Sequence, residues 1–128
     1  MKKSNIPRVV CERLPLYLRR VEKCESEGRE KVSSDEIGRD LGVSGAQVRR
    51  DLTYFGQFGS PGLGYRCSEL KNHLRSILGV DRKWKLAVVG VGNIGRALIN
   101  YKNFRRRGFD ITAAFDVDRR KVGTTIEK

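Results

Sequence analysis

Apolar residues recur at spacings of three and four along the first part of the chain, a pattern typical of helices with one buried face. From Pro7 to about Glu27 this spacing predicts an amphipathic helix, which Pro15 is expected to break or kink because proline removes a backbone hydrogen bond. The same spacing predicts a helix from Ser68 to Leu78, with Gly79 as its stop. The apolar positions of the first helix are Val10, Leu14, Leu18 and Val21.

Two short helices joined by a tight turn are predicted between Val32 and Leu52. Gly42 lies where the first of them must end, since glycine adopts the left-handed conformation that terminates helices. This is the build of a helix-turn-helix. Both helices begin with a capping box, in which a serine hydroxyl and a side chain three residues later satisfy backbone N–H groups, and the pairs are Ser33 with Glu36 and Ser44 with Gln47.

In a helix-turn-helix the second helix enters the major groove of DNA by its N-terminal end, so outward positions between Ser44 and Tyr54 are candidate base readers. Glutamine pairs bidentately with adenine and arginine with guanine, whereas a serine hydroxyl suits phosphate. We therefore expect Gln47, Arg49 and Arg50 to read bases and Ser44 to contact the phosphate backbone. The alternative interpretation is a helical hairpin with a solvated charged face.

Glycines interleaved with aromatic residues after Asp51 predict a small β-hairpin, a wing beside the second helix with Ser60 and Pro61 near its tip. Tyr54, Gly59 and Ser60 then join the residues expected to contact DNA. The alternative is an irregular loop that covers the helical core. The glycines are Gly56, Gly59, Gly62 and Gly64.

A strand followed by a glycine-rich turn is predicted where Leu86 to Gly95 read LAVVGVGNIG. The G-x-G-x-x-G spacing is that of dinucleotide-binding turns: Gly90 for the tight turn, Gly92 for approach of a pyrophosphate and Gly95 for close packing of helix on strand. The turn residues expected to bind the nucleotide are Gly90, Val91, Gly92, Asn93, Ile94 and Gly95.

A second apolar run, Ile111 to Phe115, ends at Asp116, where an acid that accepts hydrogen bonds from ribose hydroxyls is expected. A carboxylate there repels a 2′-phosphate, so NAD(H) is predicted in preference to NADP(H). Two parallel strands alone would leave apolar surface uncovered on the residues from Leu86 to Val89 and from Ile111 to Phe115.

The net charge of +12 indicates an anionic partner, for which nucleic acid is the usual one. The excess is spread along the chain, with fifteen basic and ten acidic residues up to residue 80 and twelve basic and five acidic residues after it. A solvated basic surface is therefore the alternative. No apolar run is long enough to span a membrane and Met1 to Asn5 is polar, which predicts a cytoplasmic protein.

Catalytic and metal-binding chemistry find little support in the sequence. Cys11, Cys24 and Cys67 are widely spaced, so we expect reduced thiols and neither a disulfide framework nor a zinc site. His73 is the only histidine, so no serine or cysteine triad has an evident base. No catalytic residue and no metal ligand are predicted.

Taken together, these stretches resemble the Rex family of redox-sensing bacterial transcriptional repressors along nearly the whole chain. The resemblance lies in IPRVVCERLPLYLR at 6–19, VSSDEIGRDLGVSGAQVRRDLTYFGQFG at 32–59, GLGY at 62–65, ILGVDRKWKLAVVGVGNIGRALINY at 77–101 and RRGFDITAAFDVDRRKVG at 106–123. It implies an α+β protein. Residues 1–80 would form a winged-helix DNA-binding domain, and residues 81–128 would form the first β-α-β unit of an incomplete Rossmann domain that binds NAD(H).

The resemblance further implies a homodimeric repressor without enzymatic activity, whose partners are double-stranded operator DNA and NADH or NAD+. NADH would favour release from the operator. Arg19 and Tyr101 match family positions that couple the two domains. The chain departs from the family in its wing tip, Ser60-Pro61, where basic residues are frequent, and it ends at Lys128, before later strands and the helix used for dimerisation, so we expect a truncated chain.

Two other interpretations stay open from the sequence. The chain is a fragment of an NAD-dependent dehydrogenase with an unrelated helical domain, or it is a DNA-binding module whose nucleotide site is vestigial. The first predicts turnover of NADH with a substrate, and the second predicts DNA binding that ignores NADH.

Overall fold

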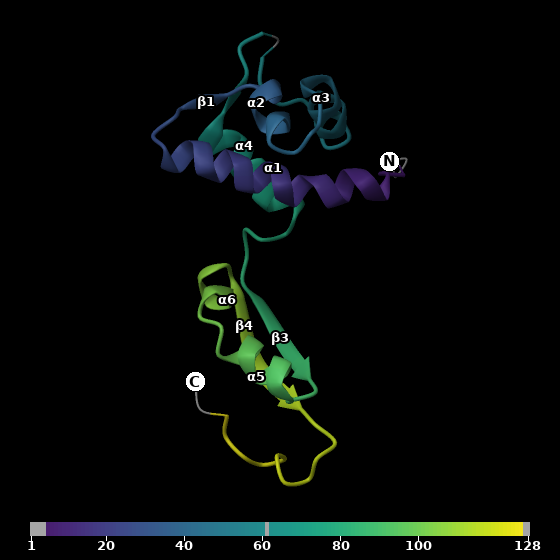
Figure 1. Ribbon diagram of the computed structural model, residues 1–128, viewed down its shortest axis with the longest axis vertical. Coiled ribbons are helices and arrows are strands. Elements are labelled where there is room, and N and C mark those ends of the chain that lie inside the picture. Colours follow the sequence, from purple (N-terminus) through teal and green to yellow (C-terminus); the bar gives the residue numbers. More distant parts are fainter. Residues whose placement is uncertain (1–4, 61, 127–128) are drawn as a thin grey trace. The chain divides into compact units, whose positions relative to one another are not determined.

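The computed structural model of the protein describes residues 5–60 and 62–126. The chain divides into two compact units, Met1–Gly79 and Val80–Lys128. The first unit is mainly helical, whereas the second is built on a pair of long strands (Figure 1). Among the described residues, no helix is long and apolar enough to cross a membrane.

Helix α1 (Arg8–Ser26) runs without a break through Pro15, so the prediction that this proline would divide the helix is wrong. A proline inside a helix costs about 3 kcal/mol. Burial of one large apolar side chain stabilises the fold by about 1.5–3 kcal/mol, and α1 buries such side chains on both sides of Pro15. The buried side chains are Val10, Leu14, Tyr17, Leu18, Val21 and Cys24.

Helices α2 (Ser34–Arg39) and α3 (Gly45–Thr53) form the predicted helix-turn-helix. The capping box at the start of α2 is confirmed: Ser33 Oγ accepts from the Glu36 N–H at 3.2 Å, and Glu36 accepts from the Ser33 N–H at 2.8 Å. Gly42 has a φ of +63°, and the Val43 N–H donates back to the Gly38 carbonyl at 3.0 Å. This bond ends α2 in the left-handed glycine turn that was predicted.

The second capping box is only half formed, which corrects the prediction for α3. Ser44 Oγ accepts from the Gln47 N–H at 3.2 Å, as expected. The Gln47 side chain does not return to the Ser44 backbone and instead donates to Asp51 at 2.8 Å. A fully buried carboxylate needs donors, and Gln47 lies one helical turn before it.

Gly38 and Gly45, for which the sequence makes no prediction, let α2 and the turn and helix that follow it approach each other closely. A Cβ at Gly38 would collide with the Val43 carbonyl, and one at Gly45 would collide with the Asp35 side chain. The turn of the helix-turn-helix is therefore fixed by sterics as well as by capping.

The predicted wing hairpin is only partly formed, because the strand that ends the glycine-rich segment pairs with a strand that precedes α2. Strand β1 (Lys31–Val32) pairs antiparallel with β2 (Tyr65–Arg66), and the loop before β2 is closed by one bridge between Ser60 and Gly64. Gly64 has a φ of +72°, and a Cβ there would press on the Val32 carbonyl at 2.8 Å. Pro61, predicted at the wing tip, lies outside the described residues.

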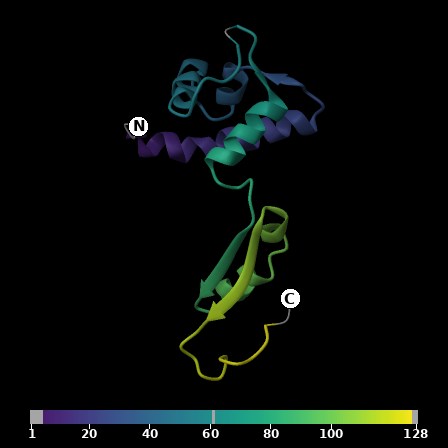
Figure 2. The same ribbon diagram turned by 180° about the vertical axis from the view of Figure 1, so that it is seen from behind.

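Helix α4 (Cys67–Ile77) crosses α1 and closes the core of the first unit (Figure 2). Cys67, Leu70 and Leu74 are buried in that contact. An ion pair of 2.5 Å between Lys71 and Glu25 borders it. The predicted helix is thus present one residue earlier than expected, and Gly79 follows it with a φ of +68°.

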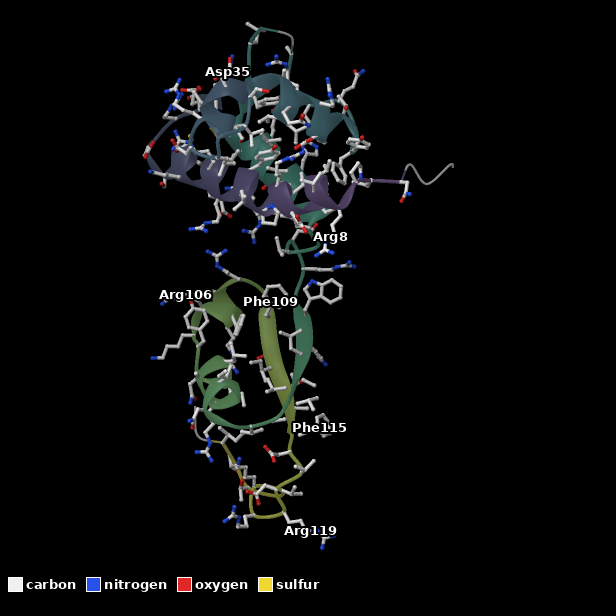
Figure 3. The ribbon with its side chains drawn as sticks, turned by 45° about the vertical axis from the view of Figure 1, so that its right-hand side comes forward. Arg8, Asp35, Arg106, Phe109, Phe115 and Arg119 are labelled. Atoms are coloured by element: carbon white, nitrogen blue, oxygen red, sulfur yellow. The ribbon has the colours of Figure 1, made fainter. Side chains whose placement is uncertain are left out.

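In the second unit, β3 (Trp84–Val89) and β4 (Phe109–Phe115) pair in parallel, and α5 (Asn93–Ile99) and α6 (Asn103–Arg106) lie on one face of the pair (Figures 1 and 2). The register shifts between Leu86 and Ala87, so Thr112 has no partner in the ladder. Phe109 and Phe115 mark the two ends of β4 (Figure 3).

The apolar surface that was expected to stay uncovered on these two strands is exposed at the strand ends and only half-exposed farther in. Val89 and Phe115, at the ends of their strands, are 84% and 58% exposed, whereas Leu86, Val88 and Ile111 are half-buried.

Candidate functional site

The outward side of α3 carries the first group of candidate residues. Arg49, Arg50 and Tyr54 are exposed there, and Ser44 is exposed at the N-terminal end. The Arg50 side chain makes no hydrogen bond or ion pair with any residue that the structure describes, so its guanidinium is available to a ligand. Arg49 instead donates from Nη1 to the hydroxyl of Ser34, on the neighbouring helix α2.

Gln47 does not lie with these outward side chains, so the outward position expected for it is not found. Its side-chain amide donates to Asp51, and the residue is half-buried. The prediction followed from the geometry of a helix-turn-helix, which does not show that a carboxylate one turn later is buried and needs a donor. The run Arg-Arg-Asp on α3 has its acid inside and its arginines outside.

Asp51 is the centre of a buried polar cluster that joins α3 to α1. Arg13 grips both carboxylate oxygens, from Nε at 2.5 Å and from Nη2 at 2.8 Å, and Tyr17 Oη donates to Oδ2 at 2.7 Å. Burial raises the pKa of the Asp51 carboxyl, but the hydrogen bonds from Arg13, Tyr17 and Gln47 outweigh it and hold that pKa below its usual value. Burial and the bond to Asp51 raise the pKa of Tyr17, so its hydroxyl stays a donor.

A cavity of about 480 Å³ lies between the helix-turn-helix and the wing. Arg49, Gly59 and Ser60 all border it, so the structure brings these three predicted residues together. Tyr54 caps the C-terminal end of α3 and is not among the lining residues.

The three motif glycines of the second unit have distinct geometries. Gly90 has a φ of +92°, which glycine adopts without strain. A Cβ at Gly95 would collide with the Gly90 carbonyl, so α5 can pack this closely on the turn only with glycine there. Around the Gly92 Cβ position there is no atom within 4 Å, which leaves that side of the turn open. Asn93 and Ile94 follow at the exposed start of α5, and Val91 is buried.

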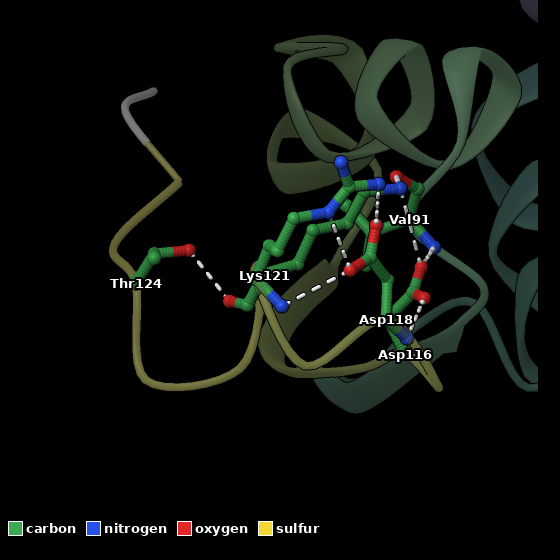
Figure 4. Close-up of polar contacts among 6 residues, drawn as sticks. Val91, Asp116, Asp118, Lys121 and Thr124 are labelled. Carbon is green, nitrogen blue, oxygen red and sulfur yellow. Dashed lines mark hydrogen bonds and ion pairs between the residues drawn. The ribbon is translucent and has the colours of Figure 1, made fainter.

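Asp116 ties the end of β4 to the glycine-rich turn (Figure 4). Its carboxylate accepts from the Val91 N–H and from the Asp118 N–H, both at 2.8 Å. Lys121 Nζ lies 3.6 Å from the same carboxylate and donates to the Val91 carbonyl at 3.0 Å. The hydrogen bonds from the Asp118 and Val91 backbone lower the pKa of Asp116, so it is ionised at neutral pH. The acid thus braces the turn with one oxygen atom.

Asp118 and Lys121 are residues that sequence reasoning missed. Asp118 accepts two side-chain hydrogen bonds from Arg120, at 3.1 and 3.0 Å (Figure 4). The sequence does hold a signal for them: FDVD repeats its acid after one residue, and three basic residues that can pair with the two acids follow directly. A cavity of about 520 Å³ is bordered by Val91, Asp116 and Lys121. Arg119, also basic, points away from the second unit (Figure 3).

Arg19 and Tyr101, the residues expected to couple the domains, belong to different units. Arg19 is exposed on α1. Tyr101 is 53% exposed, packs edge-on against Phe104 and accepts a hydrogen bond from Asn103 at 3.0 Å.

Two protein-family profiles match the chain. The family described as "Putative DNA-binding protein N-terminus" matches residues 5–53, and the family described as "CoA binding domain" matches residues 81–128. The first match covers the helix-turn-helix and the second covers the glycine-rich turn with Asp116.

Full-length relatives show the same combination. The chain is 46% identical over 123 residues to the redox-sensing transcriptional repressor Rex of Syntrophobacter fumaroxidans, covering 96% of this chain and 59% of that protein. It is 45% identical over 128 residues to Rex of Carboxydothermus hydrogenoformans, covering 100% of this chain and 62% of that protein. The chain thus spans about three fifths of the length of the curated relatives it matches.

Solved structures agree with these relatives. RSP, a Rex-family repressor, in complex with β-NAD+ and operator DNA matches with a TM-score of 0.89 and 37% identity, covering 96% of this chain and 57% of that one. RSP in complex with β-NADH matches with a TM-score of 0.83 and 35% identity, covering 96% and 56%. A winged helix-turn-helix and the first part of a Rossmann domain therefore occur in the order found in these proteins, and the chain belongs to the Rex family of redox-sensing transcriptional repressors.

Proposed function

We propose that the protein acts as a redox-sensing transcriptional repressor, which binds operator DNA through residues 1–80 and NAD(H) through residues 81–128. The observation that carries this proposal is the presence, in one chain, of a candidate recognition helix whose outward arginine has no partner among the described residues and of a glycine turn with an open side. Similarity to Rex repressors over 96% of the chain supports the combination. The family relationship also supports a homodimer that works in the cytoplasm and transfers no hydride.

On the DNA side, α3 enters the major groove and Arg50 reads a base, since its guanidinium is exposed and has no described partner. Ser44, Arg49 and Tyr54 flank it, and Gly59 and Ser60 approach the DNA backbone from the wing. Gln47 reaches a base only if it leaves Asp51, which would remove one of the donors of a buried carboxylate.

On the nucleotide side, the pyrophosphate of NAD(H) approaches the turn at Gly92, where there is open space for it. Asp116 keeps the turn in shape through the Val91 N–H and offers its remaining acceptor capacity to ribose hydroxyls. The negative charge of Asp116 disfavours a 2′-phosphate, which supports NAD(H) over NADP(H), whereas the charge of Asp118 is paired with Arg120.

The regulatory link needs only that NADH prefer the arrangement of the protein that does not bind DNA. NADH then weakens operator binding, and by linkage the operator weakens NADH binding by the same factor. Arg19 and Tyr101 are proposed to contribute to this coupling.

Titration of NADH into a complex of this chain with DNA tests the proposal. The DNA would be a duplex enriched by the chain from a randomised pool, and the expected result is release with NADH but retention with NAD+. Retention in both cases supports a DNA-binding module with a vestigial nucleotide site. Turnover of NADH with a substrate supports a dehydrogenase and contradicts the repressor.

Coenzyme A forms a third arm of this titration, because the profile that matches residues 81–128 is named for it. Coenzyme A and NAD(H) share an adenosine diphosphate group, so the glycine turn alone does not separate them. Competition between the two measures which one the turn prefers. Tighter binding of coenzyme A than of NADH contradicts the proposed cofactor.

A further inference from the structure

The buried cluster around Asp51 has no part in the contacts proposed with DNA, yet it holds the helix that makes them. Asp51 lies on α3, one residue after Arg50, and its side chain is fully buried. Arg13 and Tyr17 reach it from α1, thirty-eight and thirty-four residues earlier in the chain. Gln47 reaches it from α3 itself.

Stability alone is a weak reason for such a cluster. The free-energy cost of removing two charges from water offsets most of their mutual attraction. Apolar side chains of similar volume often stabilise a protein equally well or better. The apolar contacts of α3, through Val48 and Leu52, tolerate small rotations of the helix because they have no fixed direction. The pair of hydrogen bonds from Arg13 to both carboxylate oxygens does have a fixed direction.

The same bonds lie on the inner side of α3, together with the buried Val48 and Leu52. With Asp51 fixed toward α1, Gln47 lies on the same inner side, one turn earlier. Ala46, Arg50 and Thr53 then fall on the outer side, where all three are exposed. A different rotation of α3 would move Arg50 away from this position.

We propose that Asp51, held by Arg13 and Tyr17, is a positioning residue for DNA recognition, which fixes the rotation of α3 about its axis and keeps Gln47 turned inward. This inference rests on the proposed role of α3 in DNA binding. Asp51 touches no base or phosphate in this proposal. Its effect is on specificity, through Arg50, and non-specific attraction to phosphate does not depend on it.

The test replaces the ion pair by apolar side chains of similar size, Arg13→Met together with Asp51→Leu, which leaves the net charge unchanged. The affinity is measured for the enriched duplex and for a scrambled duplex of the same composition. The ratio of the two affinities is expected to fall about tenfold or more, which corresponds to the loss of one good base contact. Binding to the scrambled duplex is expected to stay near wild type. The thermal midpoint is expected to fall modestly, because the buried Tyr17 hydroxyl loses its acceptor.

The matched control removes another ion pair of α1, Lys71→Met together with Glu25→Leu. That pair is also 2.5 Å long and joins α1 to α4 without touching α3. Its loss should leave the affinity ratio unchanged. Tyr17→Phe is the milder variant if the double replacement does not fold, since it removes one hydroxyl donor and keeps both charges. For it we expect the ratio to fall by about threefold, near the net contribution of one hydrogen bond.

The outcomes separate the two proposals. Folded variants of the Asp51 cluster that keep the wild-type affinity ratio overturn the positioning role, while the repressor function stands. Equal losses of the ratio in the cluster variants and in the control also overturn it, because the effect would then be a general one on the fold. A wild-type chain that enriches no sequence contradicts the proposed DNA-binding function, and this inference falls with it.

Discussion

Polar side chains in this protein either form hydrogen bonds that hold the backbone in place or stay available to bind a ligand. Asp116 and Gln47 are expected from sequence to meet ligands, yet each is bonded to its own chain, Asp116 to the Val91 N–H and Gln47 to Asp51. Sequence patterns locate such residues well. They do not reveal which polar atoms are already hydrogen-bonded within the fold. Asp116 bonds to a residue 25 positions earlier, and Gln47 bonds to Asp51, which Arg13 holds from 38 positions earlier.

Arg50→Ala tests an arginine of α3 that is exposed and has no partner within residues 5–60 and 62–126. If Arg50 reads a guanine, its loss should weaken binding to the enriched duplex by about 1–3 kcal/mol and relax the preference at one base position. Lys23→Ala is the matched control, because Lys23 is exposed near the C-terminal end of α1. Equal affinities of the Arg50→Ala and wild-type chains would remove Arg50 from the contact surface.

Gly92→Ala and Gly95→Ala form a matched pair for the nucleotide site. The Gly92 Cβ position is open and its φ of −84° suits alanine, so the fold should change by less than about 0.5 kcal/mol. NADH affinity should nevertheless fall about tenfold or more, because a methyl group occupies the space of the pyrophosphate. Calorimetric titration measures this loss.

Gly95→Ala should act through the fold instead. Its methyl group meets the Gly90 carbonyl, and we expect a destabilisation of about 1–3 kcal/mol, as in other overpacked sites. Denaturant unfolding followed at Trp84 in β3 reports on this unit. Normal NADH binding by Gly92→Ala would contradict the position proposed for the pyrophosphate.

At the scale of elements, helix ends and close helix contacts follow simple rules, and deviations have identifiable causes. The start of α2 and the left-handed stop at Gly42 could be predicted because capping is local. The continuity of α1 through Pro15 could not, since burial along both halves of the helix outweighs a local rule. The register shift opposite Thr112 also has no local signal, because it depends on how two strands meet.

The capping box of α2 predicts a dependence of stability on acid. Hydrogen bonds from the Ser33 backbone N–H and from Arg29 lower the pKa of Glu36 to about 2. A carboxyl whose pKa is lower in the folded protein stabilises it above the unfolded pKa of about 4.3, and this contribution is lost as the pH falls from there toward 2.

Glu36→Gln keeps an acceptor for the Ser33 N–H and removes the charge. We therefore expect it to lower stability at pH 7 by about 1 kcal/mol and to flatten the loss of stability between pH 5 and 2, within the window set by these pKa values. Urea unfolding at several pH values measures both effects. Glu69→Gln, at an exposed pair of 4.0 Å, is the control, and equal pH profiles for the two variants would contradict the role given to Glu36.

At the scale of the whole molecule, the two units differ in how much apolar surface they bury. Among the residues that the structure describes, all but one of the buried apolar side chains lie in the first unit, and the exception is Val91. Val89, Phe115 and Val117 are exposed in the second unit. The order of the larger elements, by contrast, follows from sequence, since periodicity and the glycine motif identify them in turn, whereas the short β1 and α6 carry no such signal.

This difference predicts unequal protection from hydrogen exchange. Backbone amides of β3 and β4 should exchange faster than those of α1 and α4, because fewer buried contacts oppose local opening. NADH at about 100 times its Kd should slow exchange in the glycine turn, equivalent to about 2.7 kcal/mol of added stability. Mass spectrometry of peptic fragments resolves the two units, and equal protection in both would contradict the assignment of a weaker second core.

The hydrogen bond between Asp116 and Val91 also sets when the glycine-rich turn can form during synthesis of the chain. A chain emerges from the ribosome in sequence order, so Val91 is made 25 residues before the carboxylate that holds it and 30 residues before Lys121. The Asp51 cluster of the first unit does not wait for later residues in this way, since the described partners of Asp51, which are Arg13, Tyr17 and Gln47, all precede it in the chain. During translation α3, for which we propose DNA reading, can therefore meet all its partners in the Asp51 cluster before the brace of the glycine-rich turn has been made.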